Sequence, residues 1–376
     1  MTQLPRPEID ADGLLEYSVV YTDRALNHMS QKFRAALNHV SATLKKTYHT
    51  EHVAVIPGSG TTAMEAVVRQ LARDQKCLIV RNGLFSYRWT QILEQGQIAA
   101  DTKVLTATQN SSDSQAPFAP APIEEVCAAI AEYKPAIVFA PHVETASGIM
   151  LPESYIKQLA DAVHAVGGLL VIDCIASGCI WLDMQNLGID VLITAPQKGW
   201  SGSPCCGLVM LNEAAYQRVQ TTNSDSFALD LKKWLSIMET FESGAHAYHA
   251  TPPTDALLTL SVVMAEAENI GFDKLKAAQI ELGQKVRALL AAKGFPSVAA
   301  AGFEAPGVVV SYTTNPDIQS GKAFLNQGMQ TASGVPLQCG ESAEYQTFRV
   351  GLFGLDKLQD VDGAVERFAQ ALDKVL

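Results

Sequence analysis

The chain has 376 residues, of which 48% are hydrophobic and 18% are charged, and these proportions exclude a largely disordered protein. Its 28 basic and 39 acidic residues give a net charge of −11 without a dense Lys/Arg cluster, which argues against nucleic acid as a partner. The start, "MTQLPRPEIDADG", does not resemble a signal peptide, and no apolar run has the length of a membrane span. We therefore expect a cytoplasmic protein, not bound to a membrane, with two domains.

The seven cysteines favour a reducing compartment. Their number is odd, most stand in apolar segments, and none has C-x-x-C spacing, so we interpret them as reduced core thiols. Cys205 and Cys206 are adjacent. Neighbouring residues of a strand point to opposite faces, which argues against a disulfide between them.

The first two thirds of the chain alternate between predicted strands and predicted helices. Short β-rich runs predict strands at 53–57, 77–81, 136–141, 169–174, 191–196 and 206–211. Helical periodicity predicts helices at 62–71, 123–133 and 153–166, and the polar segment 108–122 is predicted as a surface loop. Continuous apolar strands are typical of a mostly parallel sheet covered on both faces, so we expect an α/β fold.

The last third predicts a smaller α/β domain. A helical stretch from about residue 256 leads into 274–294, followed by a strand at 307–313, a helix near 320–332, a strand at 347–352 and a final amphipathic helix. We expect an N-terminal arm at 1–25, a large domain at 26–270 and a small C-terminal domain at 271–376.

A run of small residues follows the first predicted strand and precedes a helix. In Gly58-Ser59-Gly60-Thr61, backbone N–H groups, hydroxyls and the helix dipole can together bind a phosphate. The segment also fits the dinucleotide motif G-x-G-x-x-A, but the next strand ends in Arg81-Asn82 where that site needs an acid. A tight turn without a ligand is a further alternative.

Asp173 and Lys198 end two successive predicted strands. Parallel strands end at the same sheet edge, so the carboxylate and the amine are predicted to share one crevice. Two alternatives need no ligand: a salt bridge between Asp173 and Lys198, or an Asp173 that caps a neighbouring loop. A phosphate site, a lysine and an acid together match pyridoxal phosphate, which forms a Schiff base with lysine and places its pyridinium nitrogen against an acid.

The segment "LLVIDCIASG…LGIDVLITAPQKGWSGSPCCGLVML" resembles the class V aminotransferases of fold type I, in particular the alanine–glyoxylate and serine–glyoxylate branch. The resemblance covers roughly residues 25 to 355. It implies the fold type I architecture, a large domain with a mostly parallel sheet and a smaller C-terminal α/β domain, and pyridoxal phosphate bound to Lys198.

The resemblance also implies roles for residues around the cofactor. "NGLFSYRW" (82–89) points to Phe85 as the ring that stacks on the cofactor, and "PHVETASGIMLP" (141–152) places Thr145 beside it, although Val143 replaces the family's glycine. Phe85 and Ile175 could equally be core residues. The residues that the resemblance places at the cofactor are Ser59, Gly60, Thr61, Phe85, Thr145, Asp173, Ile175, Gln197 and Lys198.

Two further segments resemble parts of the family site. "YHATPP" (248–253) implies that Tyr248 and Thr251 reach the cofactor phosphate of a neighbouring subunit, and hence a homodimer with shared sites. "TFRVGLFG" (347–354) implies that Arg349 binds the substrate carboxylate, which agrees with the bidentate chemistry of a guanidinium. The alternatives are a plain turn before Pro252 and a surface ion pair of Arg349.

The N-terminal segment departs from the family. The glyoxylate enzymes usually begin with a Gly-Pro-Gly-Pro turn, whereas this chain reads "EYSVVYTDRALNHMSQKF" (16–33). In relatives this region lines the substrate pocket. Tyr21, Thr22 and Arg24 could therefore contact the substrate or could simply pack the arm.

We expect an aminotransferase that moves an amino group from a small L-amino acid, such as alanine or serine, to glyoxylate or pyruvate, with no bound metal. A lyase or desulfurase is the nearest alternative. Relatives that extract sulfur usually have a mobile catalytic cysteine and a histidine just before the lysine, whereas this chain has Gln197 before Lys198. A nicotinamide dehydrogenase leaves Lys198, Asp173 and Arg349 without a role. A catalytically silent binding protein on the same fold is the third alternative.

Overall fold

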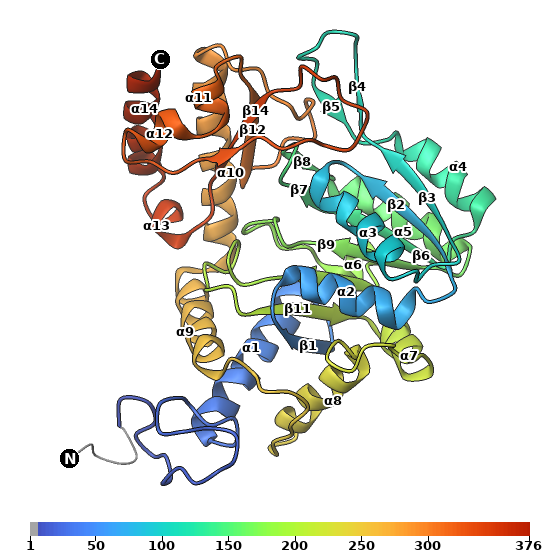
Figure 1. Cartoon of the computed structure of the whole chain (residues 1–376), viewed down its shortest axis with the longest axis vertical. Helices are drawn as coiled ribbons and strands as arrows, with labels where there is room; N and C mark the ends of the chain where they lie inside the picture. The colour runs from blue at the N-terminus through green and yellow to red at the C-terminus, as the bar shows by residue number, and fades with distance from the viewer. Residues whose placement is uncertain (1–6) are drawn as a thin grey trace.

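The computed structural model describes residues 7–376, and its centre is a seven-stranded sheet (Figure 1). The strands lie in the order β1 (His52–Pro57), β11 (Cys206–Leu211), β10 (Val191–Thr194), β9 (Leu169–Asp173), β6 (Ile137–Pro141), β2 (Lys76–Arg81) and β3 (Asp101–Thr106). β11 is antiparallel to both of its neighbours, and the other pairs are parallel. The prediction of a mostly parallel sheet is confirmed.

Helices cover both faces of this sheet because the strands are apolar on both sides. In β2, Leu78 and Val80 pack into the core on one face, and Cys77 and Ile79 into the core on the other. One face is covered by α1 (Gln31–Tyr48), α4 (Ile123–Tyr133), α5 (Glu153–Ala165), α6 (Met184–Leu187) and α9 (Thr254–Ile270). The other is covered by α2 (Gly60–Leu71), α3 (Leu84–Gln95), α7 (Glu213–Thr221) and α8 (Leu231–Glu242), the last of which also reaches the first core at the β1 edge.

The structure adds elements that the sequence patterns did not predict. β3 is an edge strand with no fully buried residue. Its sequence has no continuous apolar run, and therefore no strand was predicted there. The predicted loop at 108–122 contains a small hairpin of β4 (Thr108–Gln109) and β5 (Phe118–Ala119). A second hairpin, β7 (Val143–Glu144) and β8 (Ile149–Met150), follows β6 directly.

The C-terminal elements surround a separate three-stranded antiparallel sheet. It consists of β12 (Val308–Tyr312), β14 (Thr347–Gly351) and β13 (Ala332–Ser333), and the helices are α10 (Phe272–Ala292), α11 (Pro316–Gln319), α12 (Lys322–Leu325), α13 (Leu355–Leu358) and α14 (Val361–Val375). The helix expected near 320–332 was wrong beyond Leu325. Gly321 and Gly328 adopt positive φ of 78° and 74°, which interrupt a helix.

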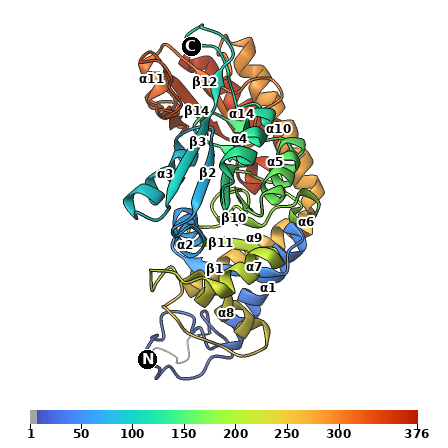
Figure 2. The ribbon, with the colours of Figure 1, turned by 90° about the vertical axis from the view of Figure 1, so that its right-hand side faces the viewer.

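The molecule is long, with the described start of the chain at one end and the C-terminal helices at the other (Figure 2). Gly271, with a φ of 101°, separates α9 from α10. The division into 1–25, 26–270 and 271–376 stays a prediction, and residues 1–6 of the arm lie outside the described part of the chain. None of the helices within residues 7–376 has both the length and the apolar content needed to cross a membrane.

Candidate active site

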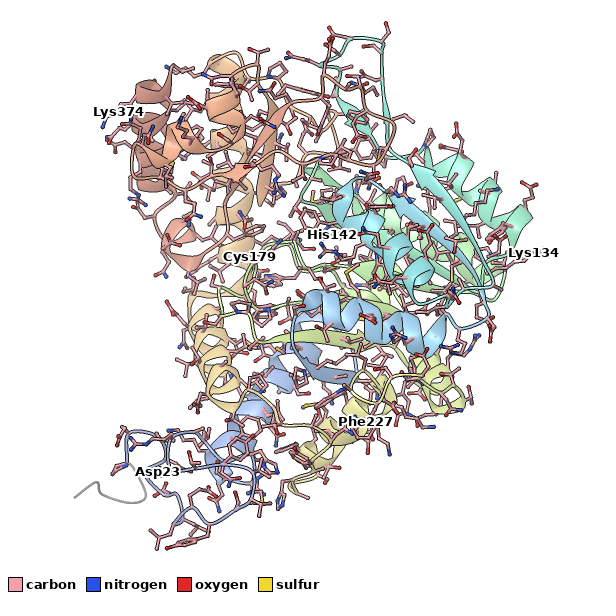
Figure 3. The ribbon with its side chains drawn as sticks, viewed as in Figure 1. Asp23, Lys134, His142, Cys179, Phe227 and Lys374 are labelled. Atoms are coloured by element: carbon pink, nitrogen blue, oxygen red, sulfur yellow. The ribbon has the colours of Figure 1, made fainter. Side chains whose placement is uncertain are left out.

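The site lies at the carboxyl edge of the seven-stranded sheet. β1, β2, β6, β9 and β10 are mutually parallel, so the segments that follow them lie at one edge, which is where open α/β sheets bind ligands. The loop backbones are tied together there: the His142 N–H donates to Asp173 O at 2.8 Å, and the Cys174 N–H to Ile193 O at 2.7 Å. His142 and Cys179 mark this region at the middle of the molecule, where the sheet meets the C-terminal elements (Figure 3).

The turn Gly58–Thr61 after β1, called the cradle below, has the conformation that its small residues predict. Gly58 has a φ of +128° and donates its N–H to Cys205 O at 3.0 Å, and Ser59 is the N-cap of α2. A Cβ on Gly60 would lie 2.4 Å from Ile175 Cδ1, so only glycine leaves the backbone open here. The first N–H groups of α2, at Gly60 and Thr61, have no acceptor within the helix and carry its positive dipole end, an arrangement that suits a phosphate.

Lys198 lies in the turn that follows β10, half-buried, with its Nζ 5.8 Å from the centroid of the Phe85 ring. Burial lowers the pKa of the Lys198 amine, and the positive charge of Arg349 lowers it further, against the opposing charge of Asp173. A lowered pKa frees the lone pair that a nucleophilic or proton-accepting lysine needs.

Asp173 is buried at the end of β9, with only 6% of its surface exposed. Burial raises the pKa of its carboxyl to about 6, and the negative charge of Glu144 adds to the rise. Its Oδ1 accepts the Ile175 N–H at 2.9 Å. Among the described ion pairs there is none between Asp173 and Lys198, so the salt bridge that would explain both residues is absent.

Three cationic groups surround the half-buried ring of Phe85, on α3. Besides Lys198, the guanidinium carbon of Arg349 lies 5.7 Å from the ring centroid and that of Arg88 lies 5.4 Å from it. The structure therefore brings Phe85, Lys198 and Arg349 together from three separate segments. The ring is only half-buried, and its exposed part can stack on a flat ligand.

Arg349 reaches the site from β14 of the small sheet. Its Nε donates to Ser333 O at 2.8 Å, and burial lowers the pKa of the guanidinium. Within residues 7–376 no carboxylate lies in ion-pair distance of Arg349, so the surface ion pair considered from the sequence is not present. The remaining guanidinium nitrogens are available to an anionic ligand.

Glu144 was missed in the sequence, although it belongs to the quoted segment 141–152. It is fully buried, and its carboxylate accepts the Phe85 N–H at 3.2 Å, the Ser86 N–H at 2.8 Å and the Ser86 Oγ–H at 2.7 Å. It thus caps α3 and fixes the backbone that carries Phe85. A carboxylate three residues after the predicted strand 136–141 was the available signal. Thr145, the next residue, is buried beside it.

Ile175 and Gln197 differ in their surroundings. Ile175 is half-buried, lies against Gly60 of the cradle and packs on the hydrophobic core. Gln197 is exposed and borders, with Lys198 and Phe353, a cavity of about 370 Å³. Space for a small molecule is therefore present next to the lysine.

Tyr248 and Thr251 lie elsewhere in the chain. Both are exposed, and their hydroxyls bond to each other at 3.0 Å. The Tyr248 ring contacts the ring of His28, with 5.6 Å between centroids. In the described chain neither hydroxyl bonds to a residue around Lys198, so a single protomer does not bring them to the site.

The adjacent thiols of Cys205 and Cys206 are unpaired and 3.8 Å apart, and all seven cysteines are free. This agrees with the interpretation of reduced thiols.

Comparisons with known proteins identify a family. The family model described as "Aminotransferase class-V" matches residues 2–362. A 2-aminoethylphosphonate–pyruvate transaminase of Pseudomonas aeruginosa is 30% identical over 324 residues, which are 84% of this chain and 81% of that protein.

Solved structures share the fold at lower identity. An alanine–glyoxylate aminotransferase of Nostoc sp. has a TM-score of 0.79 and 20% identity, with 93% of this chain and 88% of that chain covered. A pyridoxamine–pyruvate aminotransferase of Mesorhizobium loti has a TM-score of 0.78 and 18% identity, with 96% and 86% covered.

Proposed function

Because this chain belongs to the class V aminotransferase family, we propose that it transfers an amino group from a small, anionic amino donor to a small 2-oxo acid, with Lys198 as the catalytic residue. It is a pyridoxal-phosphate-dependent aminotransferase with the fold type I architecture. The observation that carries the proposal is the convergence of Lys198 and Arg349 on the ring of Phe85, at 5.8 and 5.7 Å.

The residues at the sheet edge fit pyridoxal phosphate. The open backbone at Gly60 and the free N–H groups of the α2 N-terminus suit its phosphate, and the half-buried Phe85 and Ile175 suit the two faces of its ring. The buried Asp173, which has no cationic partner within ion-pair distance among residues 7–376, suits the pyridinium nitrogen. We assign Ser59, Gly60, Thr61, Phe85, Thr145, Asp173, Ile175, Gln197 and Lys198 to the cofactor.

When bound, the cofactor supplies an aldehyde that condenses with amines and a ring that withdraws electrons from the amino carbon. Lys198 would contribute the amine that holds the cofactor and, once free, would be the base that accepts the proton of the substrate's amino carbon. Asp173 keeps a positive charge on the ring nitrogen. Arg349 binds the substrate anion and orients the C–H bond that breaks.

We propose pyruvate or glyoxylate as the acceptor and alanine, serine or a comparable small amino compound as the donor. The names of the relatives pair such an acceptor with alanine or with 2-aminoethylphosphonate. All of these carry a carboxylate or phosphonate, and a single guanidinium binds either group bidentately. A panel of donors in the half-reaction, followed by the change in cofactor absorbance, identifies the substrate. No response to any anionic donor would contradict the proposal.

Reduction with borohydride tests the site directly. The purified holoenzyme should absorb in the visible, lose that absorbance on reduction, and carry the cofactor mass on the peptide that contains Lys198. An adduct on another lysine would contradict the assignment of Lys198 as the residue that binds the cofactor.

We also propose a homodimer in which Tyr248 and Thr251 complete the site of the partner. The N-terminal face, defined as Leu14–Met29 with His246–Thr251, exposes Leu14, Tyr17 and Val19 at 89%, 90% and 103%. Such an apolar patch is typical of a protein interface. The Tyr21 hydroxyl bonds to Pro252 O at 3.3 Å, so both parts of this face are joined.

Mixed dimers test the shared site. Lys198→Ala chains and Tyr248→Ala/Thr251→Ala chains are each expected to be impaired alone. If a site takes residues from both protomers, random mixing restores about one quarter of the sites, because half of the dimers are mixed and each has one intact site. No restoration, with mixed dimers verified by mass, would contradict sharing.

We further propose a cytoplasmic location, which the seven free cysteines favour. Cell fractionation checks it, and recovery outside the cytoplasm would refute it.

A further inference from the structure

Arg88 is the third cation at the site, and the roles proposed above do not use it. It lies on α3 three residues after Phe85, so both side chains project from one side of the helix. Its Nη1 donates to Thr61 Oγ1 at 2.9 Å, and its guanidinium carbon lies 5.4 Å from the centroid of the Phe85 ring. Arg88 thus joins the stacking ring to the first turn of α2.

Arg88 forms no ion pair in the described part of the chain, and the charge of Asp173 acts on it only from beyond ion-pair distance. No carboxylate of residues 7–376 lies within ion-pair distance of it, whereas Arg69, on α2, pairs with both Glu65 and Asp225. The protein bond to Thr61 engages one of the guanidinium donors and accounts for no negative charge. A half-buried guanidinium in this state is suited to an anion that is bound and not covalently part of the chain.

The position of Arg88 selects which anion. Thr61 belongs to the first turn of α2, where the free N–H groups and the helix dipole already favour a phosphate. Arg349 comes from β14 of the other sheet and bonds to Ser333. The two arginines therefore lie on different structural supports, one attached to the cradle and the other to the small sheet.

We propose that Arg88 binds the phosphate group of pyridoxal phosphate, as the cationic side of a cradle whose other side is the N-terminus of α2. This inference rests on the proposed placement of the cofactor. The Thr61 hydroxyl holds the guanidinium toward the cradle, and Glu144, through the backbone of Phe85 and Ser86, holds the start of α3. Phosphate binding and ring stacking are then supported by one helix.

The test compares two ligands that differ only in the phosphate. Dissociation constants for pyridoxal phosphate and for pyridoxal are measured with cofactor-free wild type, Arg88→Gln and Arg81→Gln. Arg81 is the matched control, because it is an arginine of the same region that lies over the Tyr87 ring and bonds to Gln338 O at 3.0 Å.

In Arg88→Gln the constant for pyridoxal phosphate should rise roughly 10- to 100-fold, the loss expected for a charge-assisted hydrogen bond, while that for pyridoxal stays unchanged. Arg81→Gln should change neither constant. Equal weakening of both ligands by Arg88→Gln, or no weakening of either, overturns the inference. So does an unchanged affinity for pyridoxal phosphate with a raised KM for the amino donor, because the anion would then be the substrate's.

A second variant is used if Arg88→Gln does not fold. Arg88→Lys keeps the charge and most of the stem but loses the planar fork, and it must still weaken pyridoxal phosphate more than pyridoxal. Borohydride trapping separates the two proposals. An adduct at Lys198 together with an unaffected Arg88→Gln refutes only the role of Arg88, whereas an adduct elsewhere refutes the proposed function.

Discussion

The carboxyl edge of the large sheet and the N-terminal face expose aromatic side chains in different settings. Around Phe85, charged groups from three segments converge, and the backbone beneath the ring is fixed by the buried carboxylate of Glu144. On the N-terminal face, Tyr17 and Val19 are almost fully exposed beside the exposed Tyr248. The two regions lie apart, as the labels of His142 and Asp23 show (Figure 3).

The comparison separates what one protomer completes by itself from what needs a second. The ring, lysine and acid positions are held by contacts within the chain, so they are ordered before any partner arrives. Burying the exposed apolar side chains of the N-terminal face against a partner would be favourable in free energy. We therefore expect changes at the sheet edge to alter chemistry and changes on the N-terminal face to alter assembly.

The strongest test of this division is the removal of the lysine. Lys198→Ala should lower turnover by at least about 10⁴-fold, because it removes both the cofactor anchor and the proton-transfer group. Steady-state kinetics measure the loss, and circular dichroism checks that the fold is kept. Lys103→Ala, on the edge strand β3, serves as the control. Retained turnover would remove Lys198 from the mechanism.

The buried acid offers a test that needs no substrate. In the cofactor-free protein the Asp173 pKa is about 6, against an ordinary value of 3.8, so the folded state favours the protonated carboxyl. That contribution to stability is complete below about pH 4 and is lost as the pH rises through 6. The advantage of Asp173→Asn in free energy of unfolding should therefore grow by up to about 3 kcal/mol between pH 4 and pH 7.5.

Urea denaturation at both pH values measures this difference. Asp161→Asn, at an exposed position of α5, serves as the control variant. A difference in free energy of unfolding that does not depend on pH would mean that burial does not raise the pKa of the Asp173 carboxyl in the folded chain.

Arg349 tests the anion anchor from the small sheet. Arg349→Gln should raise the KM for carboxylate or phosphonate substrates by roughly 10- to 100-fold, because a charge-assisted pair is lost, while the affinity for pyridoxal phosphate stays the same. Arg349→Lys should recover part of the loss. A KM equal to that of the wild type would assign Arg349 to structure alone.

The smallest expected effect concerns assembly. Val19→Ser should weaken dimerisation by about 1–2 kcal/mol for each of the two side chains buried in a homodimer, and so raise the dimer dissociation constant at least about tenfold. Analytical ultracentrifugation measures it. Leu325→Ser on α12, which is 64% exposed at the opposite end of the molecule, is the control. Equal effects of both variants would place the interface elsewhere.

Much of the site was predictable because its signals are local. A strand that ends in Asp173, a strand followed by Lys198, and a glycine-rich turn before a helix are each visible in a short window, and parallel strands share an edge. Glu144 and Arg88 were not predicted. Their roles depend on a carboxylate that caps a helix 58 residues earlier in the chain and on a bond to Thr61, 27 residues away.

The sequence by itself determined the strand and helix alternation, the carboxyl-edge site and the residue types that meet there, since hydrophobic period and turn chemistry act over neighbouring residues. Only the tertiary structure decided that Arg349 of the small sheet faces Phe85, that Asp173 has no salt bridge to any residue of 7–376, and that Tyr248 bonds to Thr251 and not to the residues around Lys198. These outcomes depend on how separate layers pack, and packing between distant segments leaves no periodic pattern in the chain.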